Sequence, residues 1–168
     1  MAGEKKQKRI MYYGEHDRAL DPQCRVSLPS EWRNKDGETE LVMIPASGSA
    51  LVLMPQETLA NFFEKLQDDV IANPKLQKAF AAIGSLTRIC RCDKQGRLAL
   101  DRKKLESIGV DNQLKMLGAI THIRICAPQN WQVPEGDDAI DGYLSDIRSV
   151  GNGAANSLAG LLGGILKQ

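Results

Sequence analysis

One pattern occurs twice in this chain of 168 residues, and the duplication constrains the fold more than any other feature. Residues 20–29 and 92–101 share an Asp-x-Gln-x-Arg core between apolar residues, and a short charged stretch with helical character follows each copy. Further on, residues 41–44 resemble 114–117, and residues 52–56 resemble 125–129. A repeated frame of this kind indicates an internal duplication. Because each half alone is too short to bury a comfortable core, the halves are expected to share one.

Each copy of the pattern predicts a tight turn in a β-hairpin. The Asp side chain accepts hydrogen bonds from its own backbone, and the fourth residue of the turn must tolerate a positive φ. Gly96 does so freely, whereas Cys24 at the same place in the first copy would be strained by roughly 1 kcal/mol in that conformation. We therefore assign a turn-shaping role to Asp21, Asp93 and Gly96.

Short strands and short helices alternate in both halves, which is not the pattern of a parallel sheet. Residues 41–44 and 51–54 are expected to be strands, and residues 56–71 an amphipathic helix. Asn73-Pro74 should break that helix, a second one should cover 75–83 and end before Gly84, and a third should cover 103–108 and end at Gly109. The predicted organisation is a basic flexible start (1–9), a first repeat (10–66), a helical linker (67–84), a second repeat (85–132) and a tail (133–168).

The formal net charge of +1 argues against a uniformly basic nucleic-acid binder, but the charge is unevenly distributed. Residues 88–104 carry seven Lys and Arg side chains against two Asp, while the tail from residue 133 is acidic on balance. A local patch, not the whole surface, is therefore the candidate for contact with phosphate.

The order and spacing of several motifs resemble the MraZ family of bacterial transcriptional regulators over roughly residues 10–132. The motifs are Tyr13-Gly14-Glu15, residues 20–29 with Trp32-Arg33, residues 93–98 with Val110, then Leu117-Gly118 and residues 128–131. The resemblance implies an α+β fold of duplicated AbrB-like swapped-hairpin β-barrel repeats. It also implies a cytoplasmic, nucleoid-associated homo-oligomeric ring that binds double-stranded DNA with direct repeats upstream of the division and cell-wall gene cluster. Two departures are Cys24, where the family usually has Gly, and Asp101, where a Pro like Pro29 is expected.

In that interpretation the arginines of the two turns contact the DNA. Arg25 and Arg97 would donate paired hydrogen bonds to guanine edges or phosphates, a task that Lys performs less specifically. The alternatives are that the two arginines are ordinary surface charges or that each pairs with the Asp of its own turn. Four neighbouring cations are expected mostly to contact phosphate and set the register, namely Lys94, Arg18, Arg91 and Arg33.

The sequence predicts no metal site, no cofactor and no enzyme. Cys90-x-Cys92 invites a metal hypothesis, with His16, His122, Cys24 and Cys126 as further ligands, but the Cys-x-x-Cys spacing of zinc sites is absent. Isolated cysteines in strands are usually small buried hydrophobes, which is the interpretation we adopt. No triad, phosphate-binding Gly-rich loop or paired-carboxylate frame appears at recognisable spacing.

The basic start leads into no apolar signal core, and no apolar run could span a bilayer, so we expect a cytoplasmic protein without a membrane partner. In the tail, residues 137–150 could form a helix, and residues 151–153 a flexible joint. A weak apolar helical stripe follows, consisting of Leu158, Leu161, Leu162, Ile165 and Leu166. The tail keeps a second function class open, an oligomeric scaffold or interaction protein without specific DNA binding.

Overall fold

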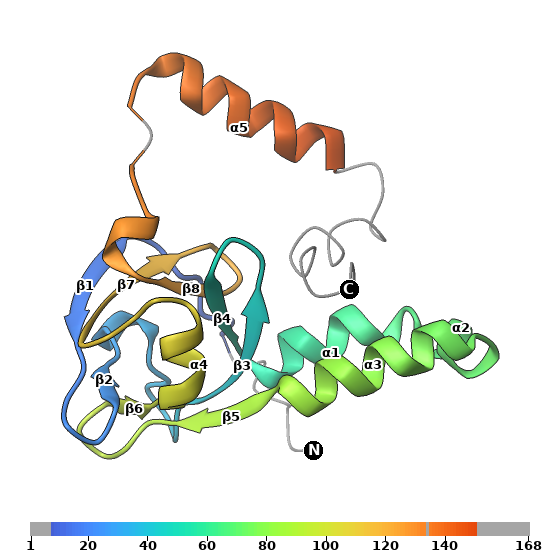
Figure 1. Ribbon diagram of the computed structural model, residues 1–168, viewed down its shortest axis with the longest axis horizontal. Coiled ribbons are helices and arrows are strands. Elements are labelled where there is room, and N and C mark those ends of the chain that lie inside the picture. Colours follow the sequence, from blue (N-terminus) through green and yellow to red (C-terminus); the bar gives the residue numbers. More distant parts are fainter. Residues whose placement is uncertain (1–7, 134, 151–168) are drawn as a thin grey trace, which may run out of the picture.

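A computed structural model describes residues 8–133 and 135–150 of the chain. Its centre is a six-stranded antiparallel sheet in the order β1-β7-β8-β4-β3-β5, beside a two-stranded antiparallel ribbon of β2 and β6 (Figure 1). The strands are β1 (Glu15–Ala19), β2 (Arg25–Ser27), β3 (Glu40–Ala46), β4 (Ala50–Met54), β5 (Arg88–Arg91), β6 (Arg97–Ala99), β7 (Gln113–Gly118) and β8 (Ile123–Cys126). The predicted α+β class and the two predicted strands of the first half are confirmed.

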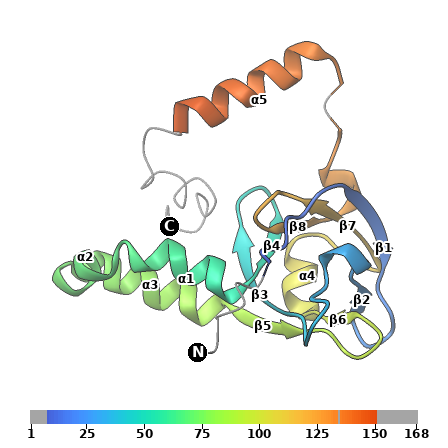
Figure 2. The same cartoon turned by 180° about the vertical axis from the view of Figure 1, so that it is seen from behind.

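The helices occupy three places. Two short 3₁₀ turns, η1 and η2, and helix α4 cover the strands, α1 to α3 project to one side, and α5 stands apart from both (Figures 1 and 2). Their bounds are η1 (Ser30–Trp32), α1 (Gln56–Glu64), α2 (Gln67–Ala72), α3 (Pro74–Leu86), α4 (Arg102–Ser107), η2 (Pro128–Asn130) and α5 (Asp137–Val150). We call residues 56–86, which contain α1 to α3, the helical arm.

The two halves of the chain interleave, because each contributes strands that pair with the other. β1 pairs with β7, β5 pairs with β3, and β2 pairs with β6. Ion pairs bridge two of these junctions. Lys115 on β7 contacts Glu15 and, at 3.0 Å, Asp17 on β1, and the Nε of Arg91 lies 2.7 Å from Glu40. One buried cluster contains residues of both halves, so the halves share a core as expected.

Strand β4 is buried on both faces, which explains its uninterrupted apolar sequence. Leu51 and Leu53 belong to the core shared by the two halves. Val52 and Met54 face the other way and pack with side chains of β3 and of the helical arm, including Ile83. The sheet therefore separates the interleaved core from a second apolar layer that anchors the arm.

The prediction of one continuous helix over residues 56–71 is wrong, because two helices occupy this segment. α1 ends at Glu64, the backbone N–H of Leu66 bonds to the Phe63 carbonyl, and α2 starts anew at Gln67. The apolar side chains of α1 cover the sheet, whereas α2 packs against α3. A change of packing partner at this point accounts for the break.

The second helix of the arm begins as predicted but ends later. Asn73 caps it by accepting a hydrogen bond from Lys75 N at 3.0 Å, and Pro74 is its first residue. The helix continues through Gly84 to Leu86, contrary to the prediction that it ends before Gly84. Ile83, buried against the sheet, holds this last turn in place, and packing overrides the weak helical propensity of glycine.

The predicted helix at residues 103–108 is present as α4, and Gly109 follows it with φ 78°. The helix expected at 137–150 is present as α5. The apolar stripe predicted from Leu158 to Leu166 and the joint at 151–153 lie outside the described residues. Within residues 8–133 and 135–150, no helix has both the length and the apolar character needed to cross a bilayer.

Two glycines should respond oppositely to substitution by alanine. A Cβ at Gly118 would lie 2.5 Å from Tyr13 N, so Gly118→Ala should lower the free energy of unfolding by about 1–3 kcal/mol. At Gly84, inside α3, nothing lies within 4 Å of the added Cβ, so Gly84→Ala should raise stability by up to about 1 kcal/mol. Urea denaturation of both variants measures this, and equal effects would contradict the described packing.

Candidate nucleic-acid interface

The ribbon of β2 and β6 presents one face to the core and the other to solvent. Val26 pairs with Leu98, and both side chains are fully buried. Since side chains alternate along a strand, the residues on either side of this pair occupy the outer face. They are Arg25, Ser27, Arg97 and Ala99, all at least partly exposed.

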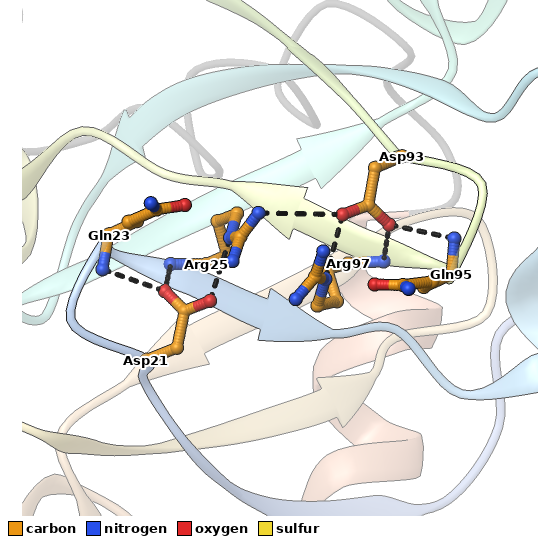
Figure 3. A network of polar contacts seen from close by, with 6 residues as sticks. All are labelled: Asp21, Gln23, Arg25, Asp93, Gln95 and Arg97. Carbon is orange, nitrogen blue, oxygen red and sulfur yellow. Dashed lines mark hydrogen bonds and ion pairs between the residues drawn. The ribbon is translucent and has the colours of Figure 1, made fainter.

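A turn of the same design precedes each strand of the ribbon. In the first, Cys24 N donates to Asp21 O at 2.9 Å, and Asp21 N donates to Arg25 O at 2.9 Å. In the second, the matching bonds join Gly96 to Asp93 at 3.0 Å and Asp93 to Arg97 at 2.9 Å. Both fourth residues have positive φ, 60° at Cys24 and 76° at Gly96. The antiparallel ribbon places these turns at its opposite ends (Figure 3).

Each Asp carboxylate organises its own turn and holds the following arginine. In the first turn, Oδ1 accepts from Gln23 N and Arg25 N, while Oδ2 accepts from Arg25 Nε at 2.7 Å. Asp93 makes the same three bonds with Gln95 N, Arg97 N and Arg97 Nε. The alternative in which each Arg pairs with its own Asp is therefore the observed geometry. Each arginine side chain bonds to its own Asp through Nε alone. Its Nη1 and Nη2 atoms take no part in the hydrogen bonds of the turn, and this pair of donors matches a guanine edge or a phosphate.

The two arginines are not equivalent. Arg25 Nη1 also lies 3.7 Å from Asp93 Oδ2, so Asp93 faces both guanidinium groups (Figure 3). Among the described residues, the Nη atoms of Arg97 have no hydrogen-bond or ion-pair partner. The fork of Arg97 is thus the freer of the two.

Hydrogen bonding keeps both turn carboxylates ionised. Partial burial acts to raise the pKa of Asp21, but the hydrogen bonds from Arg25 outweigh it and lower the pKa below its ordinary value. The pKa of Asp93 is also lowered, chiefly by the hydrogen bond from Arg97 N. Two carboxylates and two guanidinium groups leave this network without net charge, so the network by itself exerts little attraction on phosphate.

Of the four other predicted contact residues, two lie at the ribbon and two are bonded to other parts of the chain. Arg18 lies along the ribbon, with its Nε donating to Ser27 O at 3.0 Å, and Lys94 is exposed at the tip of the second turn. Arg91 is engaged with Glu40. Arg33 donates to Leu28 O at 2.7 Å, and its guanidinium covers Gly96 so closely that a Cβ there would lie 2.1 Å from its Cζ. The structure thus brings Arg18 and Lys94 to the ribbon and gives Arg33 a turn-packing role.

Sequence reasoning missed Ser27, the polar residue between the two arginines on the outer face. It pairs with Arg97 across the ribbon, and its side chain is exposed. Hydroxyl groups can donate to or accept from base edges and phosphates. Because side chains alternate along a strand, the buried Val26 would have placed Ser27 on the outer face. That Ser27 lies opposite Arg97 could not be foreseen, because it depends on pairing between distant segments.

The cysteine thiols take no part in the Asp–Arg network. Cys24, Cys90 and Cys126 are buried and Cys92 is partly exposed, all as free thiols, and burial raises the pKa of Cys90 to about 11. In the described part of the chain, no three His, Cys, Asp or Glu side chains are arranged to hold a metal ion. His122 lies in the loop before β8.

Comparison with known proteins finds relatives that share one name. The chain is 28% identical over 142 residues to the transcriptional regulator MraZ of Lachnoclostridium phytofermentans, covering 82% of this chain and 97% of the relative. The MraZ regulators of Caldicellulosiruptor saccharolyticus (25%, covering 77% and 90%) and Clostridium tetani (24%, covering 79% and 92%) are similar over comparable lengths. No protein-family profile matches the chain. The predicted resemblance to the MraZ family is confirmed.

Gly96→Ala should be costly for two separable reasons. The left-handed backbone disfavours a Cβ by about 1–2 kcal/mol, and displacing Arg33 adds about 1–3 kcal/mol. In an Arg33→Ala background the same substitution should cost only the first part. Denaturation of the four proteins in this double-mutant cycle gives both terms, and an identical cost in both backgrounds would show that Arg33 does not pack on Gly96.

The turn carboxylates should make stability depend on acid. Because the folded pKa of Asp93 is lowered, its ion pair and hydrogen bonds stabilise the fold fully above the ordinary carboxyl pKa of about 4. That contribution is lost as the pH falls through the folded value. The gap in urea midpoint between the wild type and Asp93→Asn should therefore be constant from pH 8 to about 5 and narrow below about 4. Asp36→Asn, at an exposed site, serves as the control, and a gap unchanged at low pH would contradict the assignment.

Proposed function

We propose that this protein is a sequence-specific DNA-binding regulator of transcription and that the β2–β6 ribbon is its DNA-contacting surface. The regulated genes would be the division and cell-wall cluster that the MraZ resemblance implies, and no catalytic role is proposed. The observation that carries the proposal is the ribbon itself, in which two Asp-held arginines lie on one outer face. A two-stranded ribbon fits the major groove of B-DNA, where base pairs are distinguished.

The residues of this face divide the work of recognition. Arg97, with its free fork, reads a guanine edge, and Arg25 reads a second position after moving away from Asp93. Lys94 and Arg18 contact the phosphates on either side and fix the register. Arg33 supports the second turn from behind, and Arg91 joins this phosphate-contacting group only when it leaves Glu40.

Assembly compensates for the small size and neutrality of one such surface. We propose a homo-oligomeric ring of protomers, each a swapped-hairpin barrel made of two AbrB-like repeats, that sets many ribbons on direct repeats of double-stranded DNA. Linked weak contacts then give high avidity without further contacts in any one protomer. The exchange of strands between the two halves supports the swapped-hairpin classification. A protein of this kind acts in the cytoplasm at the nucleoid.

Arginine substitutions test the proposal directly. Arg97→Ala should weaken binding to a duplex from the region upstream of the protein's own operon by about 5- to 100-fold. Arg25→Ala should weaken it less, because Arg25 Nη1 already faces Asp93. Gel shifts over a salt series measure the losses, and sedimentation checks that the assembly is intact.

The matched control is Arg88→Ala, which removes an exposed arginine whose Nη1 bonds to the Ser85 and Thr87 carbonyls, away from the ribbon. It should leave the preference over a scrambled duplex unchanged. Unchanged affinity in the Arg25→Ala/Arg97→Ala double variant would reject the ribbon as the reading surface. If the wild type does not prefer the upstream duplex, the alternative of an oligomeric scaffold without specific DNA binding is favoured.

A further inference from the structure

Helix α5 carries an apolar stripe that is exposed in the described part of the chain. Ile140, Tyr143, Leu144 and Ile147 are 58%, 54%, 45% and 66% exposed, and they fall on one face at helical spacing. In both views α5 stands away from the sheet and the helical arm (Figures 1 and 2). A helix of 14 residues is marginal in water without packing, and Gly142 weakens it further. A surface that covers the stripe would therefore stabilise the helix.

The spacing of the four apolar residues is symmetric, because it is the same from the N-terminal and from the C-terminal end of the stripe. Ile140 and Ile147 are its ends, two residues separate each end from the Tyr143-Leu144 pair, and that pair is its centre. A two-fold axis between residues 143 and 144 sets Ile140 of one helix beside Ile147 of another. Such self-complementarity is what an isologous contact between identical chains requires.

The charges beside the stripe favour the antiparallel direction. With about 100° per residue, Asp137, Asp141 and Arg148 lie on the same flank. About the same two-fold axis, Arg148 falls between Asp137 and Asp141 of the second helix, two residues or about 3 Å along the axis from each. Asp146 lies on the opposite flank. Among the described residues, no carboxylate lies within ion-pair distance of Arg148.

We propose that α5 pairs antiparallel with α5 of a second copy of this chain, through the Ile140–Ile147 stripe and the Arg148 ion pairs. A parallel pair would set this flank against the opposite flank of the second helix, so Arg148 would lose its place between Asp137 and Asp141. A membrane surface is a poorer occupant, because α5 carries four Asp and one Arg and anionic lipids attract basic helices.

The contact is small, with four apolar side chains from each helix, so its strength depends on how many copies act together. Neighbours in a ring meet through two different surfaces, whereas this contact is two-fold. If the proposed ring forms, α5 pairing therefore joins one ring to another and does not close a single ring. The pairing itself depends on neither the ring nor DNA.

Cysteine cross-linking of the full-length chain tests the pairing. The background is Cys92→Ser, which removes the one thiol that is not buried. Leu144→Cys places a thiol next to its own copy at the two-fold axis and should give disulfide-linked chain pairs on mild oxidation. Ser145→Cys, one residue along and on the opposite helix face, is the control and should give several times fewer. Non-reducing electrophoresis without DNA reads the result, so a failure of DNA binding does not affect it.

Charge reversal in the Leu144→Cys background provides a second readout. Arg148→Glu and Asp141→Lys should each lower the yield of linked pairs, and the two together should restore it relative to either alone. These positions are seven residues apart in one helix, too far to pair within it, so restoration requires the second copy. Equal cross-linking at 144 and 145, or single reversals without effect, would overturn the proposal. Docking of α5 on its own sheet would bury position 144 and leave 145 exposed, so position 144 would cross-link no better than 145 and the proposal would likewise be overturned.

Discussion

The pairing of β2 with β6 joins the two halves of the chain and sets both Asp–Arg turns on one surface. Neither strand exceeds three residues, and a ribbon so short is not stable alone. It persists because Val26 and Leu98 lie under it in a core to which both halves contribute. Leu28 N bonds to Gly96 O, and Leu100 N bonds to Cys24 O, both at 3.0 Å, so the end of each strand is fastened to the other half's turn. Burial of one face fixes the register, and the register places both arginines on the other face.

How much could be read from the sequence depends on how local each feature is. The turns were readable, because Asp21 and Asp93 bond to groups two and four residues away and the required positive φ is set locally. The pairs Arg91–Glu40 and Trp131–Glu15 join residues far apart in the chain. Their geometry follows from strand register and loop packing, which periodicity does not specify. The same reason explains why Ser27 was missed and why the role of Arg33 at Gly96 could not be foreseen.

Duplication supplied two similar turns, and their surroundings then diverged. At Gly96 the space over the backbone is filled by the Arg33 guanidinium, so glycine is required for its conformation and for its size. At the equivalent place, Cys24 accepts the strain of φ 60°, and its side chain is buried in the shared core. Asp93 faces two arginines, whereas Asp21 holds one. The second turn therefore presents the Nη atoms of Arg97 to solvent more freely than the first turn presents those of Arg25.

Neutrality of the Asp–Arg network has a physical consequence for the proposed recognition of DNA. A uniformly basic surface binds any duplex, because counterion release rewards every phosphate contact. Here each guanidinium charge is matched by a carboxylate that also fixes its direction, so nonspecific attraction falls while the hydrogen-bonding geometry is kept. Weak single contacts of this kind gain affinity by multiplication. In the proposed assembly, the number of ribbons held together would then determine how tightly a repeated DNA sequence is bound.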